Sequence, residues 1–368
     1  MSEKRLATAV DTLLDELVRS GAEIGLQVAV IRNGRTVVDA AHGVADPRTA
    51  TPVDPGTLFW AGSTAKGVAA SLAHVLIERG DLTDDMRIVE VWPEFEAHGK
   101  DAVTLRHVLL HTAGVPGLPP DTTAADLCDW DRMCVVIADS EPWWEPGTRF
   151  GYHAKTFGFL LGETLRRATG KTISALLREH VTDPLGVGDE VHFGVPEALL
   201  PRVARQVAPD GSGPVRPEPG SPLDRAMPPG VVPDADYANR PDLLTSDIPA
   251  EGTMSARGVA RVYSALLGHV DGVNLVSPGR RTAMAAIAFT GMDEVMGFPA
   301  SCAFGYSPFR PSGRGRPGST FGWLGANGSA AFADIDSGVA VAVMRNRFTP
   351  GEISTVSRID QLIADELP

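Results

Sequence analysis

Ser63 and Lys66 are the two residues whose types and spacing best suit covalent chemistry in this chain. The lysine is one of only five, beside 28 arginines, and it lies in an otherwise apolar stretch that runs from residue 58 to residue 70. Burial disfavours the charged form of a lysine, so its amine can lose a proton near neutral pH, which a guanidinium cannot do. Residues at i and i+3 share one face of a helix, so Lys66 can take the proton of the Ser63 hydroxyl and make it a nucleophile.

The residues around Ser63 predict a strand, a tight turn and a buried helix. Residues 57–60 are strand-like, Gly62 permits a tight turn, and small and apolar residues continue from Ser63 to Ile77. A serine at such a helix start lies beside free backbone N–H groups. A single Ser-x-x-Lys match also fits a capping serine followed by a lysine that extends to solvent, so the spacing alone does not decide between the two interpretations.

Three further segments carry motifs in a set order along the chain. They are residues 109–114 (Leu-Leu-His-Thr-Ala-Gly), residues 143–158, which contain Tyr152, and residues 321–329, which contain Gly-Ala-Asn-Gly-Ser. Together with Ser63 and Lys66, these segments make the chain resemble the class C β-lactamase superfamily. The resemblance is strongest to its esterase branch, the family VIII carboxylesterases and related transesterases, and it covers nearly the whole chain.

The resemblance implies three catalytic residues. Ser63 is expected to be the nucleophile, Lys66 its partner in proton transfer, and Tyr152 the tyrosine of the family. A phenolate is stabilised beside an ammonium group, so Tyr152 and Lys66 are expected to act as one coupled base. The alternative for Tyr152 is a core aromatic residue with a satisfied hydroxyl.

The segment 325–329 matches the edge strand that lines the active site in the family. The backbone N–H groups of Ser63 and Ala326 are expected to form the oxyanion hole, where one donor is typically worth about 2.7 to 4 kcal/mol. The expected substrate contacts are Trp323, Gly325, Ala154, His153 and Trp144. His153 adjoins Tyr152, and alternate neighbours in an extended chain point to opposite sides. The alternative for 325–329 is a glycine-rich turn that leads into the last hairpin.

Two departures from the β-lactamase pattern point to a neutral ester as substrate. Trp323 replaces the lysine or histidine of the edge-strand motif, and Ala154 replaces the asparagine of Tyr-x-Asn. The first change removes a charge that would hold a substrate carboxylate, and the second removes an amide that would hydrogen-bond a substrate side chain. We therefore expect a carboxylesterase that acts through an acyl-Ser63 intermediate on a small-molecule ester.

The first half-reaction is shared with other acyl-transfer enzymes, so alternatives stay open. A transesterase or an amide-forming transacylase of secondary metabolism, such as antibiotic biosynthesis, would use the same acyl-enzyme with an alcohol or amine as acceptor. A β-lactamase or D-amino peptidase is less favoured. A penicillin-binding sensor without turnover is also less favoured, because Lys66 and Tyr152 are both retained and an inert binder needs no base.

Matching patterns at the two ends of the chain predict one sheet. An amphipathic helix over residues 3–20 precedes an apolar run at 26–31, and Asn33-Gly34 favours a tight hairpin because both central residues take positive φ. Residues 331–344 predict a second hairpin, and residues 351–366 a helix. The expected fold is α/β (α+β), of the β-lactamase/transpeptidase type, with an antiparallel sheet from both chain ends flanked by helices.

The middle of the chain predicts an inserted, all-helical domain over residues 81–249, with residues 1–80 and 250–368 forming the sheet domain. Helices are expected near residues 104–111, 124–138, 156–169 and 172–181, with Thr104 and Thr172 as caps. Residues 196–249 hold twelve of the 29 prolines, which excludes long helices. This segment is expected to be a rigid wall or lid of the active site, or else an exposed linker.

Charge and composition limit the classes of partner and cofactor that the protein is expected to bind. A net charge of −13 disfavours nucleic acid and anionic membranes, and no apolar run reaches 18 residues, so a cytoplasmic location is expected. The odd cysteine count, at Cys128, Cys134 and Cys302, favours free thiols. His107 and His111 stand at i, i+4, but Val108 occupies the position of a metalloprotease glutamate, so no metal and no cofactor are expected. The oligomeric state stays open.

Overall fold

The sheet is built from both ends of the chain, as expected. The computed structural model describes residues 3–209, 215–308 and 310–367. Six antiparallel strands follow the order β10-β11-β12-β1-β2-β3, so the last hairpin of the chain pairs directly with the first. The bounds are β1 Gly25–Arg32, β2 Arg35–Asp46, β3 Thr51–Pro52, β10 Thr320–Leu324, β11 Ala330–Asp334 and β12 Val339–Arg345.

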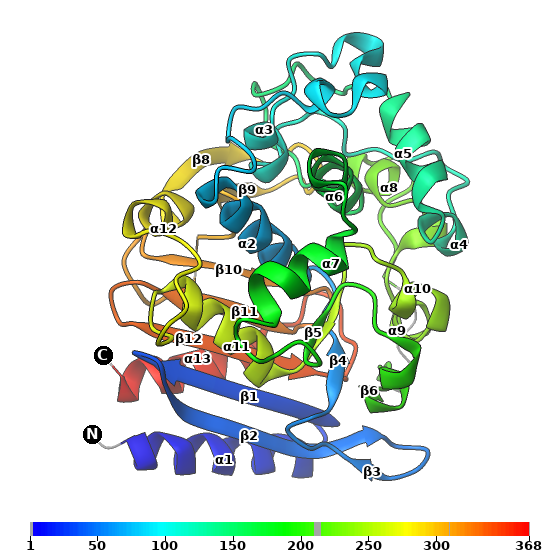
Figure 1. The fold of residues 1–368 in the computed structure, drawn as a ribbon. Coiled ribbons are helices and arrows are strands. Elements are labelled where there is room, and N and C mark those ends of the chain that lie inside the picture. Colours follow the sequence, from blue (N-terminus) through cyan, green and yellow to red (C-terminus); the bar gives the residue numbers. More distant parts are fainter. Residues whose placement is uncertain (1–2, 210–214, 309, 368) are drawn as a thin grey trace.

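The alternation of side chains along the sheet explains its two helical layers (Figure 1). In β12, the valines at 339, 341 and 343 pack with the helices α1 (Glu3–Arg19) and α13 (Ser354–Glu366). The alanines at 340 and 342 belong to the core on the opposite face, where α2 (Thr64–Glu78) and α11 (Ala256–Leu266) lie. Small side chains on this face let the two helices approach the strands closely.

Among the four helices expected in the helical region, the one over 156–169 is confirmed, those near 104–111 and 172–181 are shorter, and the one over 124–138 is divided. The elements between the halves of the sheet are α3 Leu105–Leu109, α4 Ala124–Leu127, α5 Trp130–Ala138, α6 Thr156–Thr169 and α7 Ile173–Leu177, with 3₁₀ turns at Ile88–Glu90 and Pro93–Gly99. The single helix expected over 124–138 is wrong, because Asp129 leaves the helical path and caps α5 by accepting the Arg132 N–H at 3.1 Å. The caps at Thr104 and Thr172 are confirmed. After α7, residues 178–182 form a π-helical turn.

The proline-rich segment folds into short pieces that pack onto the rest of the chain. Its described elements are β6 Val203–Ala204, α8 Pro222–Ala226, α9 Ala235–Ala238 and α10 Pro241–Thr245, with 3₁₀ turns at Glu197–Arg202 and Pro229–Val231. β6 joins β5 (Val191–His192), β7 (Thr253–Met254) and β4 (Leu58–Trp60) in a second sheet of order β5-β7-β4-β6. Tyr237, Leu243 and Leu244 are buried, so the interpretation as an exposed linker is wrong for the described part.

A projecting hairpin completes the fold. β8 (Ile287–Met292) and β9 (Pro299–Ala303) pair only with each other, after helix α12 (Pro278–Ala285). In the described part of the chain no helix has the length and apolar character needed to cross a bilayer, and the three cysteines are free thiols.

The first hairpin provides a test of the sheet. Asn33 and Gly34 have φ of 47° and 79°, and a Cβ on Gly34 would lie 2.0 Å from the carbonyl oxygen of His269. Gly34→Ala is expected to lower the free energy of unfolding well beyond the left-handed strain alone, which is about 1–2 kcal/mol. Urea unfolding followed by circular dichroism measures the loss.

Gly80→Ala is the matched control for this variant. Gly80 also has a positive φ, of 82°, but a Cβ there meets nothing within 4 Å. The control is expected to lose only the strain common to both sites. Equal losses in the two variants would contradict the packing described for the hairpin.

Candidate active site

The predicted strand, turn and helix around Ser63 are confirmed. β4 ends at Trp60, Gly62 turns the chain with φ of 50°, and α2 begins directly after Ser63. The Ala61 N–H donates to the Gly252 carbonyl at 2.8 Å, which ties this turn to the segment before β7. Ser63 therefore lies at a helix start whose path is fixed on both sides.

The side chains of Ser63, Lys66 and Tyr152 meet. Lys66 Nζ donates to Ser63 Oγ at 3.1 Å and to the Ala250 carbonyl at 3.1 Å, while Tyr152 Oη and Ser63 Oγ are 2.7 Å apart. Lys66 is fully buried, and the Ser63 side chain makes no capping hydrogen bond. The interpretation as a capping serine followed by a lysine that extends to solvent is therefore wrong.

Burial acts on the two ionisable groups in opposite directions. Desolvation lowers the pKa of Lys66 to about 7, although the Glu251 carboxylate opposes this shift. Desolvation raises the pKa of Tyr152 to about 12, against the smaller effects of its hydrogen bond with Ser63 and of Lys155. Burial thus outweighs the nearby positive charge, and the pKa of Tyr152 shifts in the direction opposite to the expected one. The expected role of Tyr152 and Lys66 as one coupled base stays a prediction. Lys66 is the member of this trio that changes protonation state near neutral pH.

Asp293 holds the backbone of Tyr152, and no motif or spacing in the chain points to this residue. Its Oδ1 accepts the N–H of Tyr152 at 3.1 Å and those of Val295 and Met296 at 2.9 Å each. The Glu294 N–H donates to the Phe150 carbonyl at 3.0 Å. The loop that joins β8 to β9 therefore fixes the chain on both sides of residue 151, although 141 residues separate Asp293 from Tyr152.

Residues 325–329 form a turn between β10 and β11. The strand ends at Leu324, the Gly325 N–H donates to the Ser329 carbonyl at 2.7 Å, and Gly328 has φ of 85°. The expected edge strand over 325–329 is wrong, and the alternative, a glycine-rich turn, is correct. The buried Asn327 amide anchors this turn by donating to the carbonyls of Trp60 and Arg345 at 2.9 and 3.1 Å.

The turn still borders a cavity that opens beside Ser63. Gly325 and Ala326 line that cavity together with Ser63. Among the residues that the structure describes, neither the Ser63 N–H nor the Ala326 N–H donates to a protein acceptor. Both amides are therefore available for an oxyanion, and their role as an oxyanion hole stays a prediction.

The cavity has a volume of about 860 Å³ and a largely apolar wall. Phe150, Ile287, Met296 and Phe298 line it beside the predicted contacts Trp323 and Ala154. The Trp323 indole N–H donates to the Gly305 carbonyl at 2.7 Å, which fixes the ring in place. The ring centroids of Trp323 and Tyr152 are 5.9 Å apart, so the indole lies beside the ring of Tyr152.

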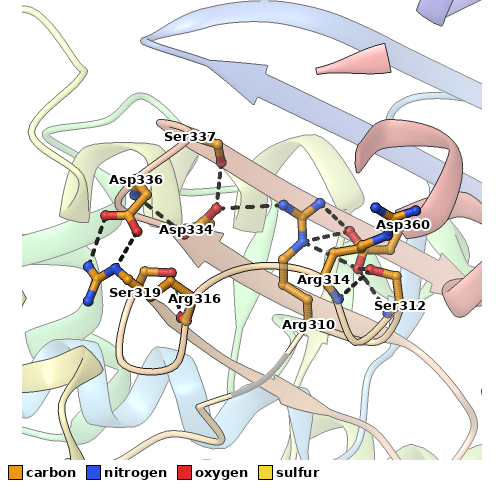
Figure 2. Close-up of polar contacts among 9 residues, drawn as sticks. All are labelled: Arg310, Ser312, Arg314, Arg316, Ser319, Asp334, Asp336, Ser337 and Asp360. Atoms are coloured by element: carbon orange, nitrogen blue, oxygen red, sulfur yellow. Dashed lines mark hydrogen bonds and ion pairs between the residues drawn. The ribbon is translucent and has the colours of Figure 1, made fainter. Parts of the chain in front are cut away.

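Among the residues that the structure describes, the four cationic side chains that line the cavity each have a carboxylate partner. Lys155 pairs with Glu251, and three arginines lie on the segment 310–316, which borders the cavity (Figure 2). The arginine pairs are Arg310 with Asp360 (3.0 Å) and Asp334 (3.6 Å), Arg314 with Asp365 (3.3 Å), and Arg316 with Asp336 (2.8 and 3.0 Å). Arg310 is also buried, so its charge is neutralised by carboxylates inside the protein.

The structure does not bring His153 or Trp144 to the cavity. The His153 Nδ1–H donates to the Gly151 carbonyl at 2.6 Å, and its Nε2 accepts the Val115 N–H at 3.1 Å. The ring is almost fully buried, so both of its nitrogens are satisfied within the protein. Trp144 is buried as well, where it packs with Ala226 and Val295, and neither Trp144 nor His153 lines the cavity. We therefore do not keep either as a substrate contact.

His107 and His111 also have no catalytic geometry. The His107 Nδ1 accepts the Thr104 N–H, and the His111 Nδ1 accepts the His153 N–H. Over the described residues, no group of three or more potential ligands could hold a metal ion.

Comparisons with known proteins identify the family of the chain. The Beta-lactamase family model matches residues 10–365. The esterase/β-lactamase LipL of Mycobacterium tuberculosis is 32% identical over 88% of this chain and 77% of its own, and esterase EstB of Burkholderia gladioli is 27% identical over 56% of this chain and 60% of its own.

Solved structures give the same result. A penicillin-binding protein homologue from Caulobacter crescentus superposes with a TM-score of 0.86 at 33% identity, over 97% of this chain and 96% of its own. A family VIII carboxylesterase superposes with a TM-score of 0.86 at 30% identity, over 96% of this chain and 97% of its own. The expected fold is confirmed, and the chain belongs to the Beta-lactamase family of serine hydrolases.

Proposed function

We propose that this protein is a carboxylesterase that cleaves neutral carboxylic esters through an acyl intermediate on Ser63. The observation that carries the proposal is the hydroxyl of Ser63, within 3.1 Å of Lys66 Nζ and 2.7 Å of Tyr152 Oη at the wall of an apolar cavity. A serine beside a desolvated amine has the arrangement of an activated nucleophile. The relatives named as esterases support ester chemistry.

The first half-reaction follows from the protonation states of these groups. The neutral amine of Lys66 takes the proton of Ser63 Oγ as that oxygen attacks the ester carbonyl. The N–H groups of Ser63 and Ala326 stabilise the oxyanion of the tetrahedral intermediate. Tyr152, a neutral phenol, donates its proton to the departing alkoxide and regains one from the Lys66 ammonium. The acyl group then stays on Ser63 Oγ.

Water completes the cycle in the second half-reaction. Lys66, neutral again, accepts a proton through Tyr152 as water attacks the acyl carbonyl, and Ser63 Oγ leaves with a proton. An alcohol or amine in place of water would make the protein a transesterase or transacylase by the same chemistry. We propose hydrolysis as the reaction, because it needs no second organic substrate.

The charge of the cavity supports a neutral substrate. Lys155, Arg310, Arg314 and Arg316 are each paired with a carboxylate of the protein, and Trp323 occupies the position of the family's edge-strand cation. A substrate carboxylate would therefore meet a largely apolar wall and cations that already have a carboxylate partner, which disfavours an acidic substrate.

Ser63→Ala is expected to abolish both the acyl adduct and turnover. Removal of a serine nucleophile typically costs about 10⁶-fold in kcat. Intact-mass spectrometry during turnover of p-nitrophenyl butyrate, with release of p-nitrophenol, measures both effects. Ser20→Ala, at the end of α1 and far from the cavity, is the control and should keep wild-type activity. Turnover at the wild-type rate by the Ser63→Ala variant would contradict the proposal.

The pH profile is expected to follow Lys66. Its pKa is lowered to about 7, and the neutral amine is the active form, so kcat/KM rises as the pH increases through about 7. The pKa of Tyr152 is raised to about 12, so its ionisation causes no loss of activity below pH 10. Stopped-flow assays with p-nitrophenyl butyrate from pH 5 to 9 check this, and activity that falls across pH 7 contradicts the role given to Lys66.

A matched pair of substrates tests the preference for neutral esters. p-Nitrophenyl butyrate and p-nitrophenyl hemisuccinate have acyl chains of equal length, but only the second carries a carboxylate. We expect kcat/KM to be at least about tenfold higher for butyrate, since 1.4 kcal/mol corresponds to a factor of ten. The spontaneous hydrolysis rate of each ester is subtracted. Equal or faster cleavage of the hemisuccinate would show that a cation is available in the cavity.

A further inference from the structure

Three polar side chains, Lys155, Tyr237 and Glu251, form a cluster at the cavity wall that the mechanism above does not use. Lys155 Nζ donates to Tyr237 Oη at 2.8 Å and contacts the Glu251 carboxylate directly. Tyr237 Oη donates to Glu251 Oε1 at 2.8 Å, so each member bonds the other two. Lys155 is 3% exposed, and the cluster is therefore an ion pair largely removed from water.

The cluster adjoins both proton-transfer residues through the backbone. Lys155 lies three residues after Tyr152 and precedes α6, while Glu251 follows Ala250, whose carbonyl accepts the Lys66 amine. A Cβ on Gly158 of α6 would lie 2.6 Å from the Ala250 nitrogen, so this helix rests directly on the segment that carries Glu251. The positions of the two charges relative to Lys66 are thus fixed by packing.

The stability of the fold alone does not explain why the protein has a buried ion pair here. Taking two charges out of water costs about as much as their attraction returns, so an apolar pair of the same volume would serve the fold as well. Here the two charges act on Lys66 with opposite signs. The Glu251 carboxylate favours the ammonium form of Lys66, and Lys66 and Lys155 repel one another.

We propose that Lys155, Glu251 and Tyr237 are positioning residues for the reaction, in which Lys155 neutralises the carboxylate that would otherwise hold Lys66 in its inactive ammonium form. The inference rests on the proposed function, because it assigns the cluster to the base of that same reaction. Tyr237 fixes the pair by bonding both charged groups.

The other titratable groups around Lys66 do not compete for this role. Burial raises the pKa of Tyr152 to about 12 and lowers the pKa of His111 well below its usual value, so both are neutral at pH 7. Burial also raises the pKa of Tyr237 well above 10. Asp293, on the β8–β9 loop, acts on Tyr152 and is unchanged in all the variants below. Lys155 and Glu251 are the pair whose charges the variants change.

The test uses opposite shifts of one pH profile. Lys155→Met leaves Glu251 unneutralised, which stabilises the Lys66 ammonium and moves the rise in activity to higher pH. Glu251→Gln removes that attraction and leaves the Lys155 charge, which moves the rise to lower pH. Each shift is expected to be about one pH unit, the lower end of what a nearby charge produces. For Lys155→Met, this corresponds to a loss of about fivefold at pH 7.

The double variant Lys155→Met/Glu251→Gln has no unpaired charge in the cluster. Its rise in activity is expected to return toward the wild-type pH, since this variant, like the wild type, has no net charge in the cluster. It also guards against misfolding, because a single buried charge is the main threat to folding in the single variants. Thermal unfolding by circular dichroism sets the assay temperature below the lowest midpoint.

Lys171→Met is the matched control. Lys171 and Glu179 also form a lysine–glutamate pair in the helical region, but both side chains are about half exposed, and no shift is expected. The proposal is overturned if the pH at which activity rises stays the same in both single variants, or if it moves in the same direction in both. A double variant shifted as far as either single variant also overturns it.

A second readout separates this inference from the proposed function. The rate at which a p-nitrophenyl phosphonate modifies Ser63, followed by intact mass, reports the nucleophile without turnover of an ester. Modification absent in Ser63→Ala and present in wild type supports the proposed nucleophile, whatever the cluster does. The same opposite shifts in the pH dependence of this rate support the cluster, and their absence overturns it while the esterase proposal stands.

Discussion

The desolvated amine of Lys66 is the constraint on which the site depends. An amine in contact with water stays charged and cannot accept a proton at neutral pH, so the protein must exclude water from it and still satisfy its N–H groups. Ser63 Oγ and the Ala250 carbonyl supply two acceptors. The turn before α2 is tied to the segment before β7 through Ala61 and Gly252, so the amine and its acceptors are held as one unit.

This constraint explains why a helix start and a distant loop converge. Ser63 comes from the start of α2, Tyr152 from the segment before α6, and Ala250 from the end of the proline-rich segment. The alanine face of the sheet lets α2 approach closely, and Gly158 lets α6 rest on residue 250. Small residues at these contacts leave little space for water around the amine.

The sequence predicts those parts of the molecule that depend on local patterns. Ser63, Lys66 and Tyr152 stand in recognisable motifs, and the terminal hairpins follow from strand alternation and from Asn33-Gly34. Asp293 and Glu251 could not be found, because their roles arise only when segments far apart in the chain meet. The direction of the pKa shift of Tyr152 also cannot be predicted from the sequence, since it depends on how deeply the side chain is buried in the folded protein. The strand expected over residues 325–329 is a turn, because a motif determines position along the chain but not backbone conformation.

The anchoring of Tyr152 by Asp293 has a consequence for how this enzyme can diversify. The loop that holds the tyrosine joins the same two strands whose side chains, such as Ile287, form a wall of the cavity. A change that widens the cavity by moving this hairpin also moves the hydroxyl of Tyr152. If Tyr152 acts as proposed, new substrates are easier to admit by replacing side chains on the hairpin than by inserting residues into it, because the length of the hairpin sets the position of the tyrosine.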